Sequence, residues 1–229
     1  MLLLGLTLFA CAGVESSVMD TAETLGKGNL SVSNTFTMGI NATEWLLMDP
    51  EDIFDGDTVH PLQYAELKYG LNDEIDLSLR GGLHVDAQSA KLLLKKQLSK
   101  RDAISTAVVF GGAYSRIDPI YWDYWYNDEV KDFEVLSGDM SLLFTRRFWR
   151  VNQITLAARG SYHLLISNFK NDLREEEHIY NAGVRANWKH AIDPFYGMIE
   201  VGIEAPLSIE DTPQVYPWMG LRAGWDFDL

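Results

Sequence analysis

Residues 65–86 carry the pattern from which the fold can be predicted, and they read AELKYGLNDEIDLSLRGGLHVD. Leucine or tyrosine occupies every second position from Leu67 to Leu71, and isoleucine or leucine does so from Ile75 to Leu79. A side-chain period of two predicts β-strands, and Asn72-Asp73 between the two runs is typical of a tight turn. The stretch therefore predicts a β-hairpin with one apolar face and one polar face.

The same alternation recurs along the rest of the chain. It is clear at residues 30–40, 65–71, 75–85, 108–114, 136–144, 154–164, 180–188, 195–203 and 221–229. A further segment, Leu92-Leu93-Leu94, could also form a helical turn, and we assign it to a strand. Ten strands is an even number, as expected when both termini lie on the same side of a membrane. The prediction is an all-β fold, a closed antiparallel up-and-down transmembrane β-barrel of about ten strands.

Composition excludes a helical membrane protein and disfavours nucleic acid as a partner. The chain has 229 residues, of which 47% are hydrophobic, and a mean hydropathy of -0.10. Beyond the N-terminus no apolar run approaches the roughly 20 residues that a membrane helix needs, whereas a barrel strand needs only about 9 to 11. Nineteen basic and 33 acidic residues give a net charge of -14, which repels phosphate backbones. We expect no nucleic-acid partner.

Loop lengths and tryptophans favour a membrane barrel over a soluble one. Long, mostly acidic connections at 41–60, 116–132, 167–177 and 206–216 alternate with short ones near 72–73, 99–102, 146–151 and 190–194. This asymmetry is typical of outer-membrane barrels, which also carry aromatic girdles at both lipid interfaces. The predicted girdles are Trp149, Trp188 and Trp225 at the periplasmic end, and Trp45, Trp122, Trp125 and Trp218 at the outer end. The expected location is the bacterial outer membrane, with its lipid and lipopolysaccharide as partners.

The N-terminus predicts export. Residues 2–10 form an apolar run that ends in Leu8-Phe9-Ala10-Cys11, which resembles the lipobox of bacterial lipoproteins, so Cys11 is the candidate lipidation site. Alternatively, Ala10-Cys11-Ala12 fits an ordinary signal cleavage site, and cleavage there would remove the chain's one cysteine. The predicted organisation is a signal or lipobox segment at 1–11, a periplasmic tether at 12–29 and the barrel at 30–229.

Three short motifs resemble a known family. The run from Thr21 to Gly28 that leads into the first strand, the Tyr-Gly-Leu hairpin at 68–77, and a C-terminus with Trp225 and Phe227 are similar to those of poorly characterised bacterial outer-membrane β-barrel proteins. The resemblance implies insertion by the barrel-assembly machinery, and it implies no ligand. The last residue departs from the family, which usually ends in phenylalanine, because it is Leu229.

The polar faces of the predicted strands bring charges of both signs into the lumen. The predicted inward network comprises Arg80, Asp139, Arg159, Arg185, Glu200, Glu204, Arg222 and Asp226, with Asp76, Lys91 and Lys95 on the same faces. Because a barrel of about ten strands has a narrow interior, these charges are expected to pair into a salt-bridged plug. The alternative is a polar path for a small solute.

Other candidate sites are weaker. His84, Asp86 and His163 could lie near the outer rim, where ten-stranded omptin proteases hold Asp and His groups, but the sequence has none of the omptin motifs and we predict no catalytic residue. The acidic loop 49–57 does not match a calcium-binding loop, and the aromatic stretch 120–126 could contact a sugar or a protein but is more typical of a barrel mouth. No cofactor motif is present.

Four functions are therefore compatible with the sequence. We expect a structural or interaction barrel without enzymatic activity. The alternatives are a small-solute channel, a rim-site hydrolase and a soluble lipid-binding barrel.

Overall fold

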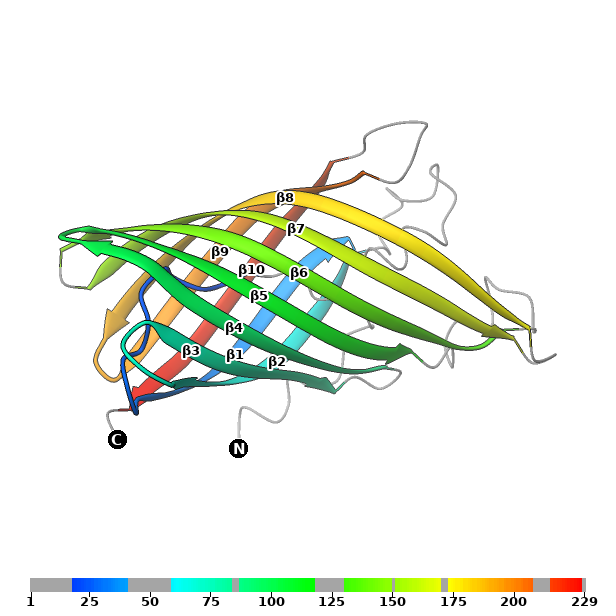
Figure 1. Cartoon of the computed structure of the whole chain (residues 1–229), viewed down its shortest axis with the longest axis horizontal. Helices are drawn as coiled ribbons and strands as arrows, with labels where there is room; N and C mark the ends of the chain where they lie inside the picture. The colour runs from blue at the N-terminus through cyan, green and yellow to red at the C-terminus, as the bar shows by residue number, and fades with distance from the viewer. Residues whose placement is uncertain are drawn as a thin grey trace.

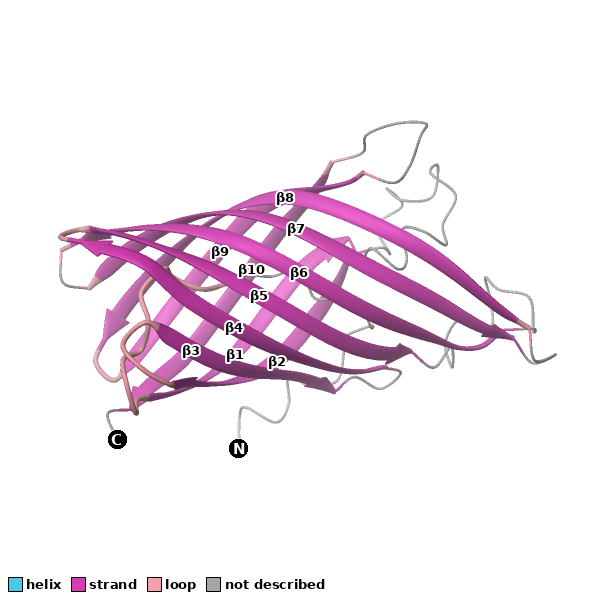
Figure 2. Cartoon of the chain, viewed as in Figure 1, coloured by secondary structure: helices cyan, strands magenta, loops and turns pink. Residues whose placement is uncertain are grey.

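The computed structural model describes residues 18–40, 59–83, 87–117, 130–149, 151–169, 173–207 and 215–227, which form one closed barrel of ten antiparallel strands (Figures 1 and 2). The strands are β1 Leu30–Ile40, β2 Val59–Gly70, β3 Ile75–Leu83, β4 Ala87–Arg101, β5 Ile104–Ile117, β6 Val130–Phe148, β7 Asn152–Phe169, β8 Arg174–Ile192, β9 Phe195–Pro206 and β10 Tyr216–Phe227. The predicted fold class and strand number are confirmed. None of the described residues forms a helix long and apolar enough to cross a membrane.

The barrel closes between its first and last strands. β1 pairs with β10 from Leu30↔Phe227 to Gly39↔Trp218, and β1 also pairs with β2. Each strand thus has a neighbour on both sides and the sheet closes on itself, although the β8 residues before Asn181 extend past the last pairing with β9. Closure is what allows strands to span a bilayer, because every backbone group of the wall must find its partner within the sheet.

Side chains of opposite character alternate between the two faces of the wall. On β3, Leu79 is 55% exposed on the outside, whereas the next residue, Arg80, is 2% exposed in the lumen. On β4, Leu92 and Leu94 face outward and Leu93 faces inward, so the ambiguous leucine run is a strand. An apolar exterior around a polar interior suits a lipid environment, and it contradicts the soluble lipid-binding alternative, which needs an apolar lumen.

The wall is uneven in height. β6, β7 and β8 have 19, 18 and 19 residues, whereas β9 has 12 and its pairing with β8 ends at Asn181↔Pro206. The hairpin of β7 and β8 therefore extends past its neighbour, as Figure 1 shows. The short connections 71–74, 102–103, 149–151 and 193–194 all lie at the opposite end, hereafter the short-turn end.

The tryptophans follow the predicted girdles only in part. Trp149, Trp188 and Trp225 are exposed near the short-turn end. Trp218 is only 6% exposed, and the prediction that it belongs to the outer girdle is wrong. It shares the inward face of β10 with Arg222, four residues away, and its ring packs in the lumen. The other three predicted girdle residues, Trp45, Trp122 and Trp125, lie outside the described residues, as does Cys11, so those assignments stay predictions.

Candidate functional site

The lumen is occupied by the chain's own N-terminal segment. Residues 18–25, hereafter the plug, run inside the barrel, where Val18, Met19 and Ala22 are almost fully buried. The described part of the segment that the sequence suggested as a periplasmic tether is therefore not a free linker. An extended segment of small and polar residues looks like a linker in the sequence alone, but here the lumen supplies its hydrogen-bond partners.

A glycine turn at the short-turn end leads from the plug into β1. Gly26 and Gly28 have φ values of 87° and 83°, a conformation that glycine adopts without strain. The Gly28 N–H donates to the Gly70 carbonyl at 2.9 Å. A Cβ atom added to Gly70 would lie 1.8 Å from the Gly26 carbonyl oxygen, so only glycine permits this approach. The turn thus fixes the position at which the plug enters the lumen.

Inward side chains satisfy the backbone of the plug. Its N–H groups donate from Met19 to Glu200 (2.6 Å), from Ala22 to Thr145 Oγ1 (2.7 Å), from Thr24 to Gln97 Oε1 (3.2 Å) and from Leu25 to Asp76 (3.1 Å). The Asn187 amide donates in turn to the Asp20 carbonyl at 3.0 Å. Because the plug pairs with none of the described strands, these side chains replace the backbone pairing that a buried segment requires.

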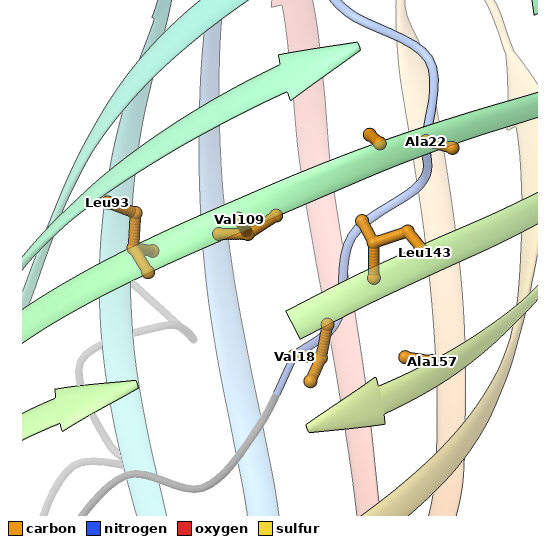
Figure 3. Packing of buried hydrophobic residues seen from close by; sticks show 7 residues of the cluster. Val18, Ala22, Leu93, Val109, Leu143 and Ala157 are labelled. Carbon is orange, nitrogen blue, oxygen red and sulfur yellow. The ribbon is translucent and has the colours of Figure 1, made fainter. Parts of the chain in front are cut away.

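An apolar patch on the inward face of β4 to β7 also contacts the plug. Together with the polar side chains that bind the plug backbone, it forms the surface that holds the plug, hereafter the seat. Val18 and Ala22 of the plug belong to one buried cluster with residues of these strands, as Figure 3 shows: Leu93, Ala107, Val109, Leu143 and Ala157. On an inward face that is mostly polar, these five apolar residues pack against the plug and exclude water from the lumen.

The first of two charge clusters surrounds the plug residue Asp20. Its carboxylate lies 2.9 Å from Lys68 Nζ and 3.1 Å from Lys95 Nζ, and Lys95 also pairs with Asp76 at 2.9 Å. Beside it, Glu66 accepts from Arg80, pairs with Arg222 at 2.9 Å and lies 3.5 Å from Lys68. We call this set the plug cluster: Asp20, Glu66, Lys68, Asp76, Arg80, Lys95 and Arg222.

The second cluster, hereafter the outer cluster, lies on β4, β6, β7, β8 and β9. Asp139 pairs with Lys91 and, at 2.8 Å, with Arg159. Arg159 also pairs with Glu204 at 3.2 Å, and Glu204 accepts from Arg185. The buried charges thus compensate one another across the lumen, as buried ion pairs must if neither partner is to be left without a counter-charge.

The structure brings most of the predicted inward residues together in these clusters. Arg80, Arg159, Arg185, Glu200 and Arg222 are at most 5% exposed. Asp226 lies apart, partly exposed at the short-turn end, 3.4 Å from Lys189. Sequence reasoning missed Asp20, Glu66 and Lys68. For the last two a signal existed, since they alternate with Leu67 and Tyr69 in the hairpin; Asp20 lies in a stretch without periodicity and had none.

His163, a weak candidate for catalysis, is buried on the inward face of β7 and not exposed at an open rim. It is 2% exposed; its Nδ1 lies 2.7 Å from Ser137 Oγ and its Nε2 3.0 Å from Ser161 Oγ. Both ring nitrogens thus contact hydroxyl groups, and neither contacts a carboxylate of the described residues that would orient a base. His84, Asp86, the acidic loop 49–57 and the aromatic stretch 120–126 lie outside the described residues.

The part of the chain that the structure describes contains no candidate metal site. Within residues 18–227, leaving out the gaps named above, no group of three His, Cys, Asp or Glu side chains could hold an ion.

Comparisons with known proteins identify no family for this chain. No protein-family model and no curated protein matches the chain. Among solved structures, the outer membrane protease OmpT from Escherichia coli aligns with 92% of this chain and 100% of its own, with 9% identity and a TM-score of 0.49. For the translocator domain of the autotransporter NalP from Neisseria meningitidis the coverages are 89% and 89%, the identity 13% and the TM-score 0.45. The N-terminal β-barrel domain of Pseudomonas aeruginosa OprF aligns with 88% of this chain and 99% of its own, with 11% identity and a TM-score of 0.36.

At such identities the likeness concerns the barrel fold and implies no ligand or activity. The apolar exterior, the polar lumen and the closed sheet of this chain identify a membrane-spanning barrel of the outer-membrane type. This agrees with the location predicted from the sequence.

Proposed function

We propose that the chain is a closed barrel of the bacterial outer membrane with a structural or interaction role, in which the plug and the two charge clusters fill the lumen. The observation that carries this proposal is the path of residues 18–25 inside the barrel, with backbone donors bound to inward side chains. A channel for small solutes needs a continuous polar path, and the plug lies across that path. A transport role is therefore the less favoured function.

A rim-site hydrolase is less well supported still. Of its three candidate residues only His163 is described, and its ring contacts two serines inside the barrel. Hydrolytic chemistry needs a base that a substrate can reach. A nearly fully buried imidazole does not meet that requirement.

The projecting wall supports an interaction role. Beyond the last pairing with β9, the edge of β8 carries four consecutive exposed charged residues, Arg174 to Glu177. Such a surface suits hydrated contacts with a polar partner more than burial in lipid. Outer-membrane lipid and lipopolysaccharide around the wall, and the barrel-assembly machinery during insertion, complete the proposed set of partners.

Planar-bilayer recording tests the closed lumen. Purified, folded protein is expected to give no stable conductance steps, because the plug and the paired charges exclude a continuous water column. A general porin reconstituted at the same protein-to-lipid ratio serves as the positive control for insertion. Regular conductance steps from the unmodified chain would contradict the proposal and favour a solute channel.

A further inference from the structure

Two amide side chains lie on the face of the wall that meets lipid. Asn34 alternates with Ser33 and Thr35, which are buried in the lumen, and Gln63 precedes Tyr64, which is also buried there. Both amides therefore belong to the outward face. Asn34 is the fifth of eleven residues in β1 and Gln63 the fifth of twelve in β2, so both lie near the middle of strands that are just long enough to cross a bilayer.

The two amides satisfy each other only in part. Gln63 Nε2 donates to Asn34 Oδ1 at 3.2 Å. This bond leaves the Asn34 amide protons and the Gln63 side-chain carbonyl oxygen without a side-chain partner among the described residues. Hydrocarbon supplies neither donors nor acceptors, so exposed amides at this depth are costly in lipid. A partner that offers both kinds of group would remove that cost.

Small residues make room for a partner beside the amides. Across from Asn34 lie Ala65 on β2 and Ala223 on β10. A groove of about 590 Å³ begins at the two amides, crosses β10 and β9 and has Ala223 and Gly197 among its lining residues. Small side chains at a membrane interface let two backbones approach closely. The amides therefore lie in a shallow depression of the lipid-facing surface.

We propose that a second copy of this chain docks on this face, with Asn34 and Gln63 at the two-fold axis. In a two-fold interface each residue meets the same surface of its partner, so the groups must be self-complementary. Carboxamides meet this condition, since the free Asn34 N–H of one copy can donate to the free Gln63 carbonyl of the other, and the reverse. An acyl chain could fill the groove but could not satisfy the amides. The proposal depends on membrane insertion and is independent of the closed lumen.

Disulfide cross-linking tests the proposed contact. Cys11→Ser removes the one native thiol and keeps a small-x-small pattern at residues 10–12, and Ala65→Cys then places a thiol beside the axis. The matched control is Ala158→Cys, an exposed outward alanine on β7. Oxidation of outer membranes is expected to link most of the Ala65→Cys protein into dimers and little of the Ala158→Cys protein. Equal linkage of both variants, or none at Ala65→Cys, would overturn the proposal.

A second measurement separates a protein partner from a lipid. In mild detergent, sedimentation of the double variant Asn34→Leu, Gln63→Leu is expected to show dimer affinity reduced at least tenfold, while the migration shift on boiling shows that the barrel still folds. An unchanged dimer fraction in the folded double variant would refute the assigned role of the amides. A monomeric wild-type protein carrying a lipid that the double variant loses would replace the second copy with that lipid.

Discussion

Replacing Glu66 with alanine is expected to lower the free energy of unfolding by about 3–5 kcal/mol, because the change leaves buried cations without their counter-charge. The Glu66 carboxylate pairs with Arg80 and Arg222 and lies 3.5 Å from Lys68, and all four side chains are at least 90% buried. Urea titration of the protein folded into lipid vesicles, followed by the migration shift on boiling, measures the loss.

The turn residue Glu74 provides the control. It lies 3.8 Å from Lys96, and both side chains are more than half exposed. A solvated pair of this kind contributes about 0–1 kcal/mol, so Glu74→Ala is expected to change little. Equal effects of the two substitutions would show that the plug cluster does not stabilise the barrel.

Deleting residues 18–25 is expected to convert a silent barrel into a conducting one. The deletion removes the segment that crosses the lumen and frees the space between the inward faces of the strands. It also removes Asp20 and Glu23 without removing a cation, and it leaves Lys68 without one of its two carboxylate partners. The open lumen should therefore prefer chloride over potassium. Single-channel currents and reversal potentials in a salt gradient measure both effects.

Folding of the deletion variant must be shown separately, and the migration shift on boiling provides that control. A milder variant, Asp20→Asn with Glu23→Gln, keeps the plug backbone and removes its ion pairs with Lys68, Lys95 and Arg147. We expect brief openings from this variant, less frequent than those of the deletion. A folded deletion variant that stays silent would mean that the plug is not what closes the lumen.

The sequence predicts the wall of the barrel well, because a strand with lipid on one side and polar groups on the other must alternate. The alternation places Arg80 inside and Leu79 outside without reference to any other strand. The same rule would have placed Trp218 inside, since it lies four residues before the inward Arg222. A tryptophan near a strand end joins a girdle only if its position in the alternation faces lipid, and Trp218 faces the lumen.

The plug could not be predicted in this way, because its position depends on pairing between distant residues. Nothing local in the stretch around Asp20 shows that Lys68 and Lys95 lie beside it in the fold. The seat left an indirect trace in Leu93, Val109 and Leu143, which are apolar residues at inward positions of the alternation. In the sequence, each is an isolated apolar residue at a position where the alternation predicts a polar one. Only the closed barrel brings the three together against Val18 and Ala22 of the plug.

Hydrogen–deuterium exchange of the plug amides tests the central claim most directly. In the folded protein, the amides of Met19, Ala22 and Leu25 donate to Glu200, Thr145 and Asp76. They are expected to exchange at least about 100-fold more slowly than in an unstructured peptide of the same sequence. Exchange at the rate of the free peptide, in a barrel whose strand amides are protected, would show that residues 18–25 do not reside in the lumen and would contradict the account.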